Sequence, residues 1–394
     1  MRITFLKFIR AVSMTALFLS TILRITPLHA QETTRLGIWV VRDQLTSTAK
    51  IDRMIAQLSA EGVSDIFVQV RGRGDALYAS ELVPFSELIT EKYFDPLRYV
   101  LRKAHEKNLR VHAWMNMFLL WSAEDPPRSY RHILNRYPEW TGINVADRQD
   151  GFCKRSELLA SGTEGVFLSP FLPDVTEHLK AVIEEVIENY EVDGIHLDYV
   201  RYPNDLYDYN EYGRAKFREE FGIDPFEIRR IARDSASVSN GVDMGVYSAA
   251  WDQFRRDAIS DFLRQVKLML VKNPRTIALS AAVKPDIDRA ADYYFQDWVS
   301  WVRNGWIDMV MPMNYVRSTN GYEANIQSIL ARELAPEKVW MGIGAYNETR
   351  LGIMTKTMVA RYRGFRQLIY FSYESFLENP EYFSAIREAL NTYH

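Results

Sequence analysis

The segment Val192–Pro203, with the sequence VDGIHLDYVRYP, decides the fold of this chain. Side chains alternate along a β-strand, so Ile195 and Leu197 share one face of the segment, and His196 and Asp198 share the opposite face. An apolar face suits packing against a helix, whereas a buried His or Asp is unfavourable unless it is paired or has a functional role. The pattern therefore predicts a strand that packs on helices with one face and contributes to a site with the other.

Seven further segments have the composition of strands, and longer amphipathic segments separate them, which is typical of parallel βα units. A closed parallel barrel needs eight strands and roughly 250 residues, and this chain of 394 residues has room for both. We therefore expect an α/β fold of the (β/α)8 TIM-barrel type. An open doubly wound sheet is disfavoured, because Arg42-Asp43-Gln44 follows the first strand where that fold has a glycine-rich phosphate loop. The predicted strands are Leu36–Val41, Asp65–Val70, Arg110–Met117, Gly194–Tyr202, Ile277–Val283, Asp308–Tyr315, Val339–Tyr346 and Leu368–Ser375.

Two connections are much longer than the others. Residues 118–173 follow the third predicted strand, and residues 204–240 follow the fourth. Both leave the C-terminal ends of their strands, the face on which barrel active sites lie, so we expect these long loops to wall a cleft. No linker or internal repeat divides the chain, and residues 31–394 are expected to form a single barrel domain.

The composition narrows the classes of partner and cofactor. A formal net charge of −3 disfavours nucleic acid as a partner, because no strongly basic surface is available to displace counterions from phosphates. Cys153 is the only cysteine, which excludes an intramolecular disulfide and a metal site built on several thiolates. The seven histidines are scattered and form no metal-binding motif, so we expect neither a metal nor another cofactor.

The first thirty residues have the features of a signal peptide. Basic residues lie at the start, residues 11–23 are apolar, and Leu28-His29-Ala30 offers a small-residue cleavage site. A membrane anchor is the alternative, but the apolar run is shorter than the ~20 residues that a span needs. We expect an exported protein of the periplasm or cell surface, without stable membrane insertion after cleavage. The oligomeric state is not predicted.

The segment that decides the fold also resembles the glycosyl-hydrolase-like 10 family of bacterial glycosidase-like proteins. The resemblance covers most of residues 35–380 and implies a (β/α)8 barrel that acts on glycans. Members are implicated in trimming cell-wall polysaccharide, including peptidoglycan strands that lack stem peptides. The expected function is therefore hydrolysis of a bacterial cell-envelope polysaccharide. The other segments similar to that family are Gly37–Val40, Phe67–Tyr78, Val111–Asn116 and Tyr137–Trp140.

Glycosidases use two carboxyl groups that flank the scissile bond, one protonated and one ionised. Asp198 is the first candidate, as nucleophile, base or stabiliser of the oxocarbenium-like transition state. For its partner we rank Glu374, at the end of the eighth predicted strand, ahead of Asp75 in the loop after the second strand and Glu348 beyond the seventh. Each partner is also consistent with a solvated loop carboxylate, and Asp198 with an ion pair that braces the barrel top.

Polar and aromatic side chains near the predicted strand ends are candidate substrate contacts. Amide, hydroxyl and imidazole groups bind sugar hydroxyls, and aromatic rings stack on the apolar face of a sugar. Arg71 and Arg73, which flank Gly72, could bind a sugar or lactyl carboxylate through two hydrogen bonds, or could brace a nearby carboxylate instead. For His112 and Trp114 a core-packing role is equally consistent. The predicted set is Arg71, Arg73, His112, Trp114, Asn116, His196, Tyr199, Arg201, Lys284, Asn314, Tyr315 and Tyr346.

Residues 193–200 are also similar to the strand-four signature of the chitinase-like family, Asp-Gly-apolar-Asp-apolar-Asp-x-Glu. Val200 occupies the position of that family's catalytic Glu, and an apolar side chain cannot protonate a leaving oxygen. Asp198 could still orient a neighbouring acetamide if another residue supplied the proton. The departure leaves a second interpretation open, in which the protein is a catalytically inactive barrel that binds glycans.

Overall fold

The computed structural model describes residues 34–91, 93–233 and 244–392. The predicted signal peptide, residues 1–30, lies outside this part of the chain. Within the described ranges, none of the helices combines the length and the apolar character that a membrane span requires.

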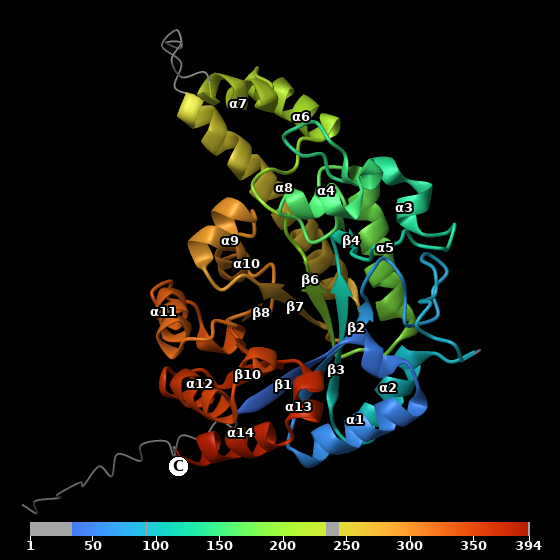
Figure 1. Cartoon of the computed structure of the whole chain (residues 1–394), viewed down its shortest axis with the longest axis vertical. Helices are drawn as coiled ribbons and strands as arrows, with labels where there is room; N and C mark the ends of the chain where they lie inside the picture. The colour runs from blue at the N-terminus through green and yellow to red at the C-terminus, as the bar shows by residue number, and fades with distance from the viewer. Residues whose placement is uncertain (1–33, 92, 234–243, 393–394) are drawn as a thin grey trace, which may run out of the picture. The chain divides into compact units, whose positions relative to one another are not determined.

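Eight parallel strands form one sheet in the order β8-β7-β6-β3-β2-β1-β10-β9, and they lie at the centre of the fold with helices around them (Figure 1). The two edge strands meet through a parallel bridge between Val310 and Val339. The N–H of Trp340 donates to the carbonyl of Val310 at 2.9 Å across the same junction. The sheet therefore returns on itself, and the predicted (β/α)8 barrel is confirmed. Its strands are β1 (Arg35–Val40), β2 (Asp65–Arg71), β3 (Arg110–Asn116), β6 (Gly194–Asp198), β7 (Ala278–Val283), β8 (Met309–Pro312), β9 (Met341–Gly344) and β10 (Gln367–Phe371).

Helices follow every strand of the barrel and cover its outer face. The helix that follows the long insert buries one of its faces, with Val175, Leu179, Val182 and Val186 all inaccessible to solvent. The α-helices are α1 (Thr48–Ala60), α2 (Pro96–His105), α3 (Ile133–Arg136), α4 (Arg155–Ala160), α5 (Pro173–Asn189), α6 (Glu211–Phe221), α7 (Pro225–Arg233), α8 (Met244–Lys272), α9 (Ile287–Tyr293), α10 (Trp298–Arg303), α11 (Thr319–Leu330), α12 (Arg350–Tyr362), α13 (Tyr373–Glu378) and α14 (Glu381–Asn391). Short 3₁₀ helices are η1 (Arg42–Leu45), η2 (Pro138–Trp140), η3 (Asp150–Phe152), η4 (Pro336–Lys338) and η5 (Ala345–Asn347).

Several strands end earlier than the sequence predicts, and the difference is largest in β6 and β10, where the backbone explains it. β6 ends at Asp198 because Tyr199 adopts a left-handed conformation with φ of 52°, which a continuing strand does not allow. β10 ends at Phe371 because α13 begins at Tyr373. Glu374 therefore lies in the first turn of a helix, and the in-and-out alternation of a strand does not apply to it.

The barrel interior is filled by large side chains that alternate with small ones. One buried cluster inside the ring contains Trp39, Phe67, Trp114 and Trp340. Gly194 makes room for this packing, because a Cβ there would lie 2.2 Å from His112 Nδ1 and 2.9 Å from the carbonyl oxygen of Ala278. The interior is thus a packed core rather than a pore, as in other parallel barrels.

The long loop after β3 folds into an insert that is held by buried carboxyl groups. Its short strands β4 (Leu119–Trp121) and β5 (Val166–Phe167) pair antiparallel. Asp150 accepts hydrogen bonds from the hydroxyl of Tyr207 at 2.7 Å and from the N–H of Phe167 at 3.2 Å, which ties the insert to the loop after β6. Burial raises the pKa of Asp150 to about 7. These contacts fix the wall of the barrel mouth that the insert forms.

Replacing Gly194 by alanine is expected to destabilise the fold by about 1–3 kcal/mol or more, since the added methyl group clashes with His112 and with backbone that cannot move freely. Chemical denaturation followed by circular dichroism measures the loss. Gly62→Ala is the control, because φ there is 74° and no atom lies near the new methyl, so only backbone strain of about 1–2 kcal/mol applies. A loss in Gly194→Ala no larger than in this control would contradict the packing argument.

Asp150→Asn is expected to flatten the dependence of folding stability on pH. The folded carboxyl keeps its proton up to a pKa of about 7, whereas an unfolded Asp releases it near pH 4. Between these pH values the folded state binds more protons, so the wild-type free energy of unfolding falls as pH rises. Urea denaturation at several pH values measures the slope. The exposed Asp147→Asn in the same insert should keep the wild-type slope, and an unchanged slope in Asp150→Asn would show that Asp150 does not titrate in this range.

Candidate active site

A cavity of about 400 Å³ lies at the mouth of the barrel, where the C-terminal ends of the strands meet. Active sites of parallel barrels are built at this face. The cavity wall combines aromatic rings with charged groups of both signs, which is suitable for binding a sugar. Its lining residues are Trp39, Val41, Arg42, Asp43, Gln69, Gly72, Arg73, Trp114, Asn116, Leu119, Ser122, Glu164, Asp198, Tyr199, Arg201, Ala282, Lys284, Met313, Tyr315 and Phe371.

The floor of the cavity rests on a buried hydrogen-bond chain. Trp39 donates its indole N–H to His196 Nε2 at 3.0 Å, and His196 Nδ1 lies 3.0 Å from the hydroxyl of Ser280. An indole nitrogen can only donate, so Nε2 carries no proton and the proton lies on Nδ1. Burial, together with the neighbouring His112, lowers the pKa of His196 well below its ordinary value. His196 is therefore a neutral side chain that orients Trp39.

Asp198 lies at the end of β6 with its carboxyl group in the cavity wall. Its Oδ2 accepts a hydrogen bond from the indole N–H of Trp114 at 3.2 Å, and its Oδ1 accepts from the N–H of Tyr199 at 2.7 Å. Burial raises the pKa of Asp198, although these hydrogen bonds and the charges of Arg201 and Lys284 act in the opposite direction. The side chain is 8% exposed, so a ligand in the cavity can reach it. The predicted direction of His196 and Asp198, away from the helix layer, is correct.

A second carboxyl group reaches the same cavity from the insert. Glu164 accepts a hydrogen bond from Arg201 at 2.8 Å, and Arg201 is nearly buried beside the rings of Tyr199 and Tyr294. Gly165 allows this approach, because a Cβ there would lie 2.1 Å from the carbonyl oxygen of Trp121. Three carboxyl groups therefore line the cavity in different surroundings: Asp198 is buried, Glu164 is ion-paired, and Asp43 is exposed.

Lys284 adds a positive charge to the same wall of the cavity. Its ammonium group lies 4.7 Å from the ring centre of Tyr294. Burial and the charge of Arg201 lower the pKa of Lys284 to about 8. The positive charge of Lys284 is therefore lost as pH rises through about 8.

The structure brings eight of the fifteen predicted site residues to this cavity and places the other seven elsewhere. The residues that line the cavity are Arg73, Trp114, Asn116, Asp198, Tyr199, Arg201, Lys284 and Tyr315. Those outside its lining are Arg71, Asp75, His112, His196, Asn314, Tyr346 and Glu374.

None of the three carboxylates ranked as partners of Asp198 lines the cavity with it. Glu374 accepts a hydrogen bond from Ser372, its Oε1 atom is buried without a hydrogen-bond partner, and burial raises its pKa. Asp75 lies in a neighbouring hollow and accepts the N–H of Arg73 at 3.0 Å. Glu348 forms a largely buried ion pair with Lys356 of α12.

Arg71 and His112, which were predicted as substrate contacts, are buried outside the cavity lining. A bulge between Gln69 and Arg71 shifts the register of β2, so Arg71 is paired with Met115 and turns out of the barrel interior into full burial. His112 stacks on Phe67 with ring centres 4.3 Å apart and lies 3.0 Å from the Asp65 carboxylate. Both residues belong to the packing around the barrel rather than to the cavity.

Asn314 and Tyr346 flank the mouth without lining the cavity. The amide of Asn314 is fully buried and donates to the carbonyl of Tyr322 at 2.9 Å. Tyr346 is 60% exposed, and its ring contacts those of Tyr315 and Phe371 edge to face. Tyr346 therefore extends the aromatic wall outward from the cavity.

Sequence reasoning missed several lining residues, chief among them Trp39, Arg42, Asp43 and Glu164. The first three lie on or directly after β1, and the inward alternation of that strand was a usable signal for Trp39. Glu164 lies in an irregular part of a 56-residue connection, 118–173, where no periodicity assigns a direction to a side chain. Only the folded insert brings it to the barrel.

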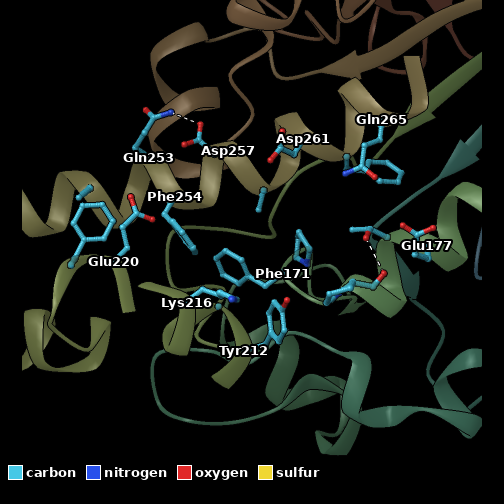
Figure 2. A pocket seen from close by; sticks show the side chains of 18 residues that line it. Phe171, Glu177, Tyr212, Lys216, Glu220, Gln253, Phe254, Asp257, Asp261 and Gln265 are labelled. Carbon is cyan, nitrogen blue, oxygen red and sulfur yellow. Dashed lines mark hydrogen bonds between the residues drawn. The ribbon is translucent and has the colours of Figure 1, made fainter. Parts of the chain in front are cut away.

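A larger hollow of about 710 Å³ lies outside the barrel, between α6, α8 and the start of α5 (Figure 2). Two of its carboxylates are engaged by neighbours on their own helices: Asp257 accepts from Gln253 at 2.7 Å, and Glu177 pairs with Lys180 at 2.6 Å. Because it is remote from the strand ends, we place the candidate site at the barrel mouth. In the part of the chain that the structure describes, no three His, Cys, Asp or Glu side chains are grouped closely enough to share a metal ion.

Comparison with known proteins identifies relatives that are named glycosyl hydrolases. The chain is 26% identical over 290 residues to glycosyl hydrolase DigH of Escherichia coli, which covers 70% of this chain and 59% of that protein. It is 24% identical over 299 residues to glycosyl hydrolase YngK of Bacillus subtilis, which covers 71% of this chain and 51% of that protein. The chain thus spans between half and three fifths of the length of these relatives.

The fold is shared with solved glycoside hydrolases. The glycoside hydrolase domain of PgaB (BpsB) from Bordetella bronchiseptica superimposes with a TM-score of 0.61 at 12% identity, covering 91% of this chain and 98% of that domain. At this identity the likeness concerns the fold alone. The model of one protein family matches residues 33–349, which include every strand of the barrel up to β9 and all three carboxyl groups of the cavity. The chain belongs to the family described as glycosyl hydrolase-like 10.

Proposed function

We propose that this protein hydrolyses glycosidic bonds in the glycan strands of peptidoglycan, and that strands without stem peptides are its substrate. The observation that carries the proposal is the pair Asp198 and Glu164, two carboxyl groups of different environment on one cavity at the barrel mouth. Family membership and the names of the curated relatives support glycoside hydrolysis. The aromatic rings of Trp39, Trp114 and Tyr315 supply flat surfaces for sugar binding.

The two carboxyl groups suit the two roles that glycoside hydrolysis requires. Burial favours the protonated form of Asp198, which makes it the candidate for protonating the leaving-group oxygen. Glu164, ion-paired with Arg201, is the candidate ionised carboxylate that stabilises the positively charged transition state, either by direct attack or by activating water. Val200, at the position of the chitinase-like acid, points away from this chemistry and is fully buried in the core.

The substrate is tested by incubating the purified protein with two sets of peptidoglycan strands, one retaining stem peptides and one stripped of them. Mass analysis of the products identifies cleavage. Release of short saccharides from the stripped strands is the expected result. Binding without any product would favour the inactive glycan-binding barrel instead.

Asp198→Asn is expected to lower kcat on a natural glycan by about 10²- to 10⁴-fold, because the amide cannot donate the proton that the leaving oxygen needs. An aryl glycoside whose phenol leaves without protonation should lose much less activity. Steady-state kinetics on both substrates measures the difference, with the thermal transition as a check on folding. Asp147→Asn, the same change at an exposed position of the insert, is the control and should keep the wild-type kcat on both substrates. Equal losses on the two substrates would exclude Asp198 as the proton donor.

Glu164→Gln and Glu374→Gln form a matched pair that assigns the second carboxyl. If Glu164 stabilises the transition state, its amide variant should lose about 10²-fold or more in kcat/KM, while Glu374→Gln, which lies outside the cavity lining, should stay within a few-fold of wild type. The comparison uses one glycan and one pH for both variants. A larger loss of kcat/KM in Glu374→Gln than in Glu164→Gln would assign the role of ionised carboxylate to Glu374.

A further inference from the structure

Arg42 and Arg73 occupy the junction of two hollows. Both line the cavity that contains Asp198, and both also line a neighbouring hollow of about 290 Å³. The neighbouring hollow is bordered by the ring of Trp121, whose centre lies 5.9 Å from the Arg73 guanidinium carbon. Arg42 lies across Gly72, where a Cβ would come within 2.9 Å of its Nη1. The two guanidinium groups are therefore held in the wall shared by the candidate active site and the neighbouring hollow.

The positive charge at this junction is weakly compensated. Among the described residues, the ion pair of Arg42 is with Asp75 at 3.9 Å, and Arg73 has no carboxylate within 4.0 Å of its guanidinium group. Asp75 already accepts the backbone N–H of Arg73, while Arg73 Nε donates to the hydroxyl of Ser122 at 3.0 Å. Burial lowers the pKa of Arg73, and the like charge of Arg42 lowers it further. The two neighbouring guanidinium groups share a single carboxylate ion pair, that of Arg42 with Asp75, which leaves donors that an anionic ligand can use.

Asp43 lines the same cavity, and its carboxylate would compete with an anionic ligand if it were paired with either arginine. It is exposed, its backbone carbonyl accepts from Lys50, and no ion pair joins its carboxylate to either arginine. The other carboxylate in this part of the wall, Glu164, is engaged by Arg201. The free donors therefore remain on Arg42 and Arg73.

We propose that Arg42 and Arg73 form a subsite that binds the carboxylate of a sugar residue next to the bond that is cleaved. This inference rests on the proposed function and specifies its substrate class, a glycan that carries free carboxylates. Such a group can come from a lactyl ether, as in stripped peptidoglycan strands, or from a uronic acid. A carboxylate that is joined to a peptide becomes an amide and loses its charge, so the subsite would also discriminate against strands with stem peptides.

Isothermal titration calorimetry with defined disaccharides tests the subsite. The probes are an N-acetylglucosaminyl-N-acetylmuramic acid disaccharide with its free lactyl carboxylate, the same disaccharide with that group converted to a primary amide, and a disaccharide of equal length that contains a uronic acid. We expect the free lactyl carboxylate to bind about tenfold or more tightly than its amide, because a charged hydrogen bond is lost on conversion. Tight binding of the uronic acid as well would show that the subsite recognises the carboxylate irrespective of its source.

Arg42→Gln and Arg73→Gln are expected to reduce the preference for carboxylate over amide to about one- to three-fold. Arg73→Lys keeps the positive charge but loses the planar guanidinium group, so an intermediate preference for carboxylate over amide is expected. This variant can be measured even if a glutamine variant fails to fold. Arg332→Gln, which removes an equal charge from an exposed pair with Asp288, should keep the wild-type preference.

Three outcomes would each overturn the subsite. The wild type could bind acid and amide equally, the preference could survive in both glutamine variants, or neither carboxylate probe could bind. A parallel assay for product formation separates this inference from the proposed function. If carboxylate preference is present but no glycan is cleaved, the subsite stands and hydrolysis is wrong. If neutral and charged glycans are cleaved equally, hydrolysis stands and the subsite is wrong.

Discussion

The hydrogen bond from the Trp39 indole to His196, deep inside the ring of strands, is the interaction on which the candidate site depends. It closes the floor of the cavity with two large rings, and it requires His196 to be neutral, because an imidazolium has no lone pair to accept the indole proton. Phe67 and Trp114 pack against the same imidazole at ring-centre distances of 5.1 and 6.4 Å. This dry layer separates the cavity from the lower half of the barrel and accounts for the burial that changes the proton affinity of Asp198.

Charge is distributed differently above and below this floor. Below it, Asp65 is fully buried, and although burial alone would raise its pKa, hydrogen bonds from His112 and Ser64 and the charge of Arg35 hold that pKa far below its ordinary value. That carboxylate is compensated from several sides, and its role is to hold the strands together. Above the floor, Asp198 is buried with fewer compensating groups, and its pKa is raised. The pKa of the same residue type is thus lowered at one end of the barrel and raised at the other.

The long insert after β3 forms one wall of the cavity at the barrel mouth, to which it contributes Leu119, Ser122 and Glu164. It delivers Glu164 to Arg201, and it places Ser122 and Trp121 beside Arg73. Loops at this face tolerate variation because the strands beneath them supply most of the buried apolar area. The insert is nevertheless internally fixed by the buried carboxyl of Asp150, so its charged groups are held in defined positions rather than on a freely moving loop.

The sequence by itself determined the elements of the barrel, the order of strands and helices, and the direction of Asp198, because hydrophobic periodicity and the alternation of side chains are local properties of the chain. It also pointed to Trp114, Arg201 and Lys284, which follow or end strands and so lie at the barrel mouth. Only the tertiary structure decided that Glu164 shares the cavity with Asp198, since Glu164 arrives through an irregular insert. It also decided that Arg42 rather than Arg71 accompanies Arg73, because a single bulge in β2 reverses the direction of one side chain, and a bulge depends on pairing between strands that are distant in sequence.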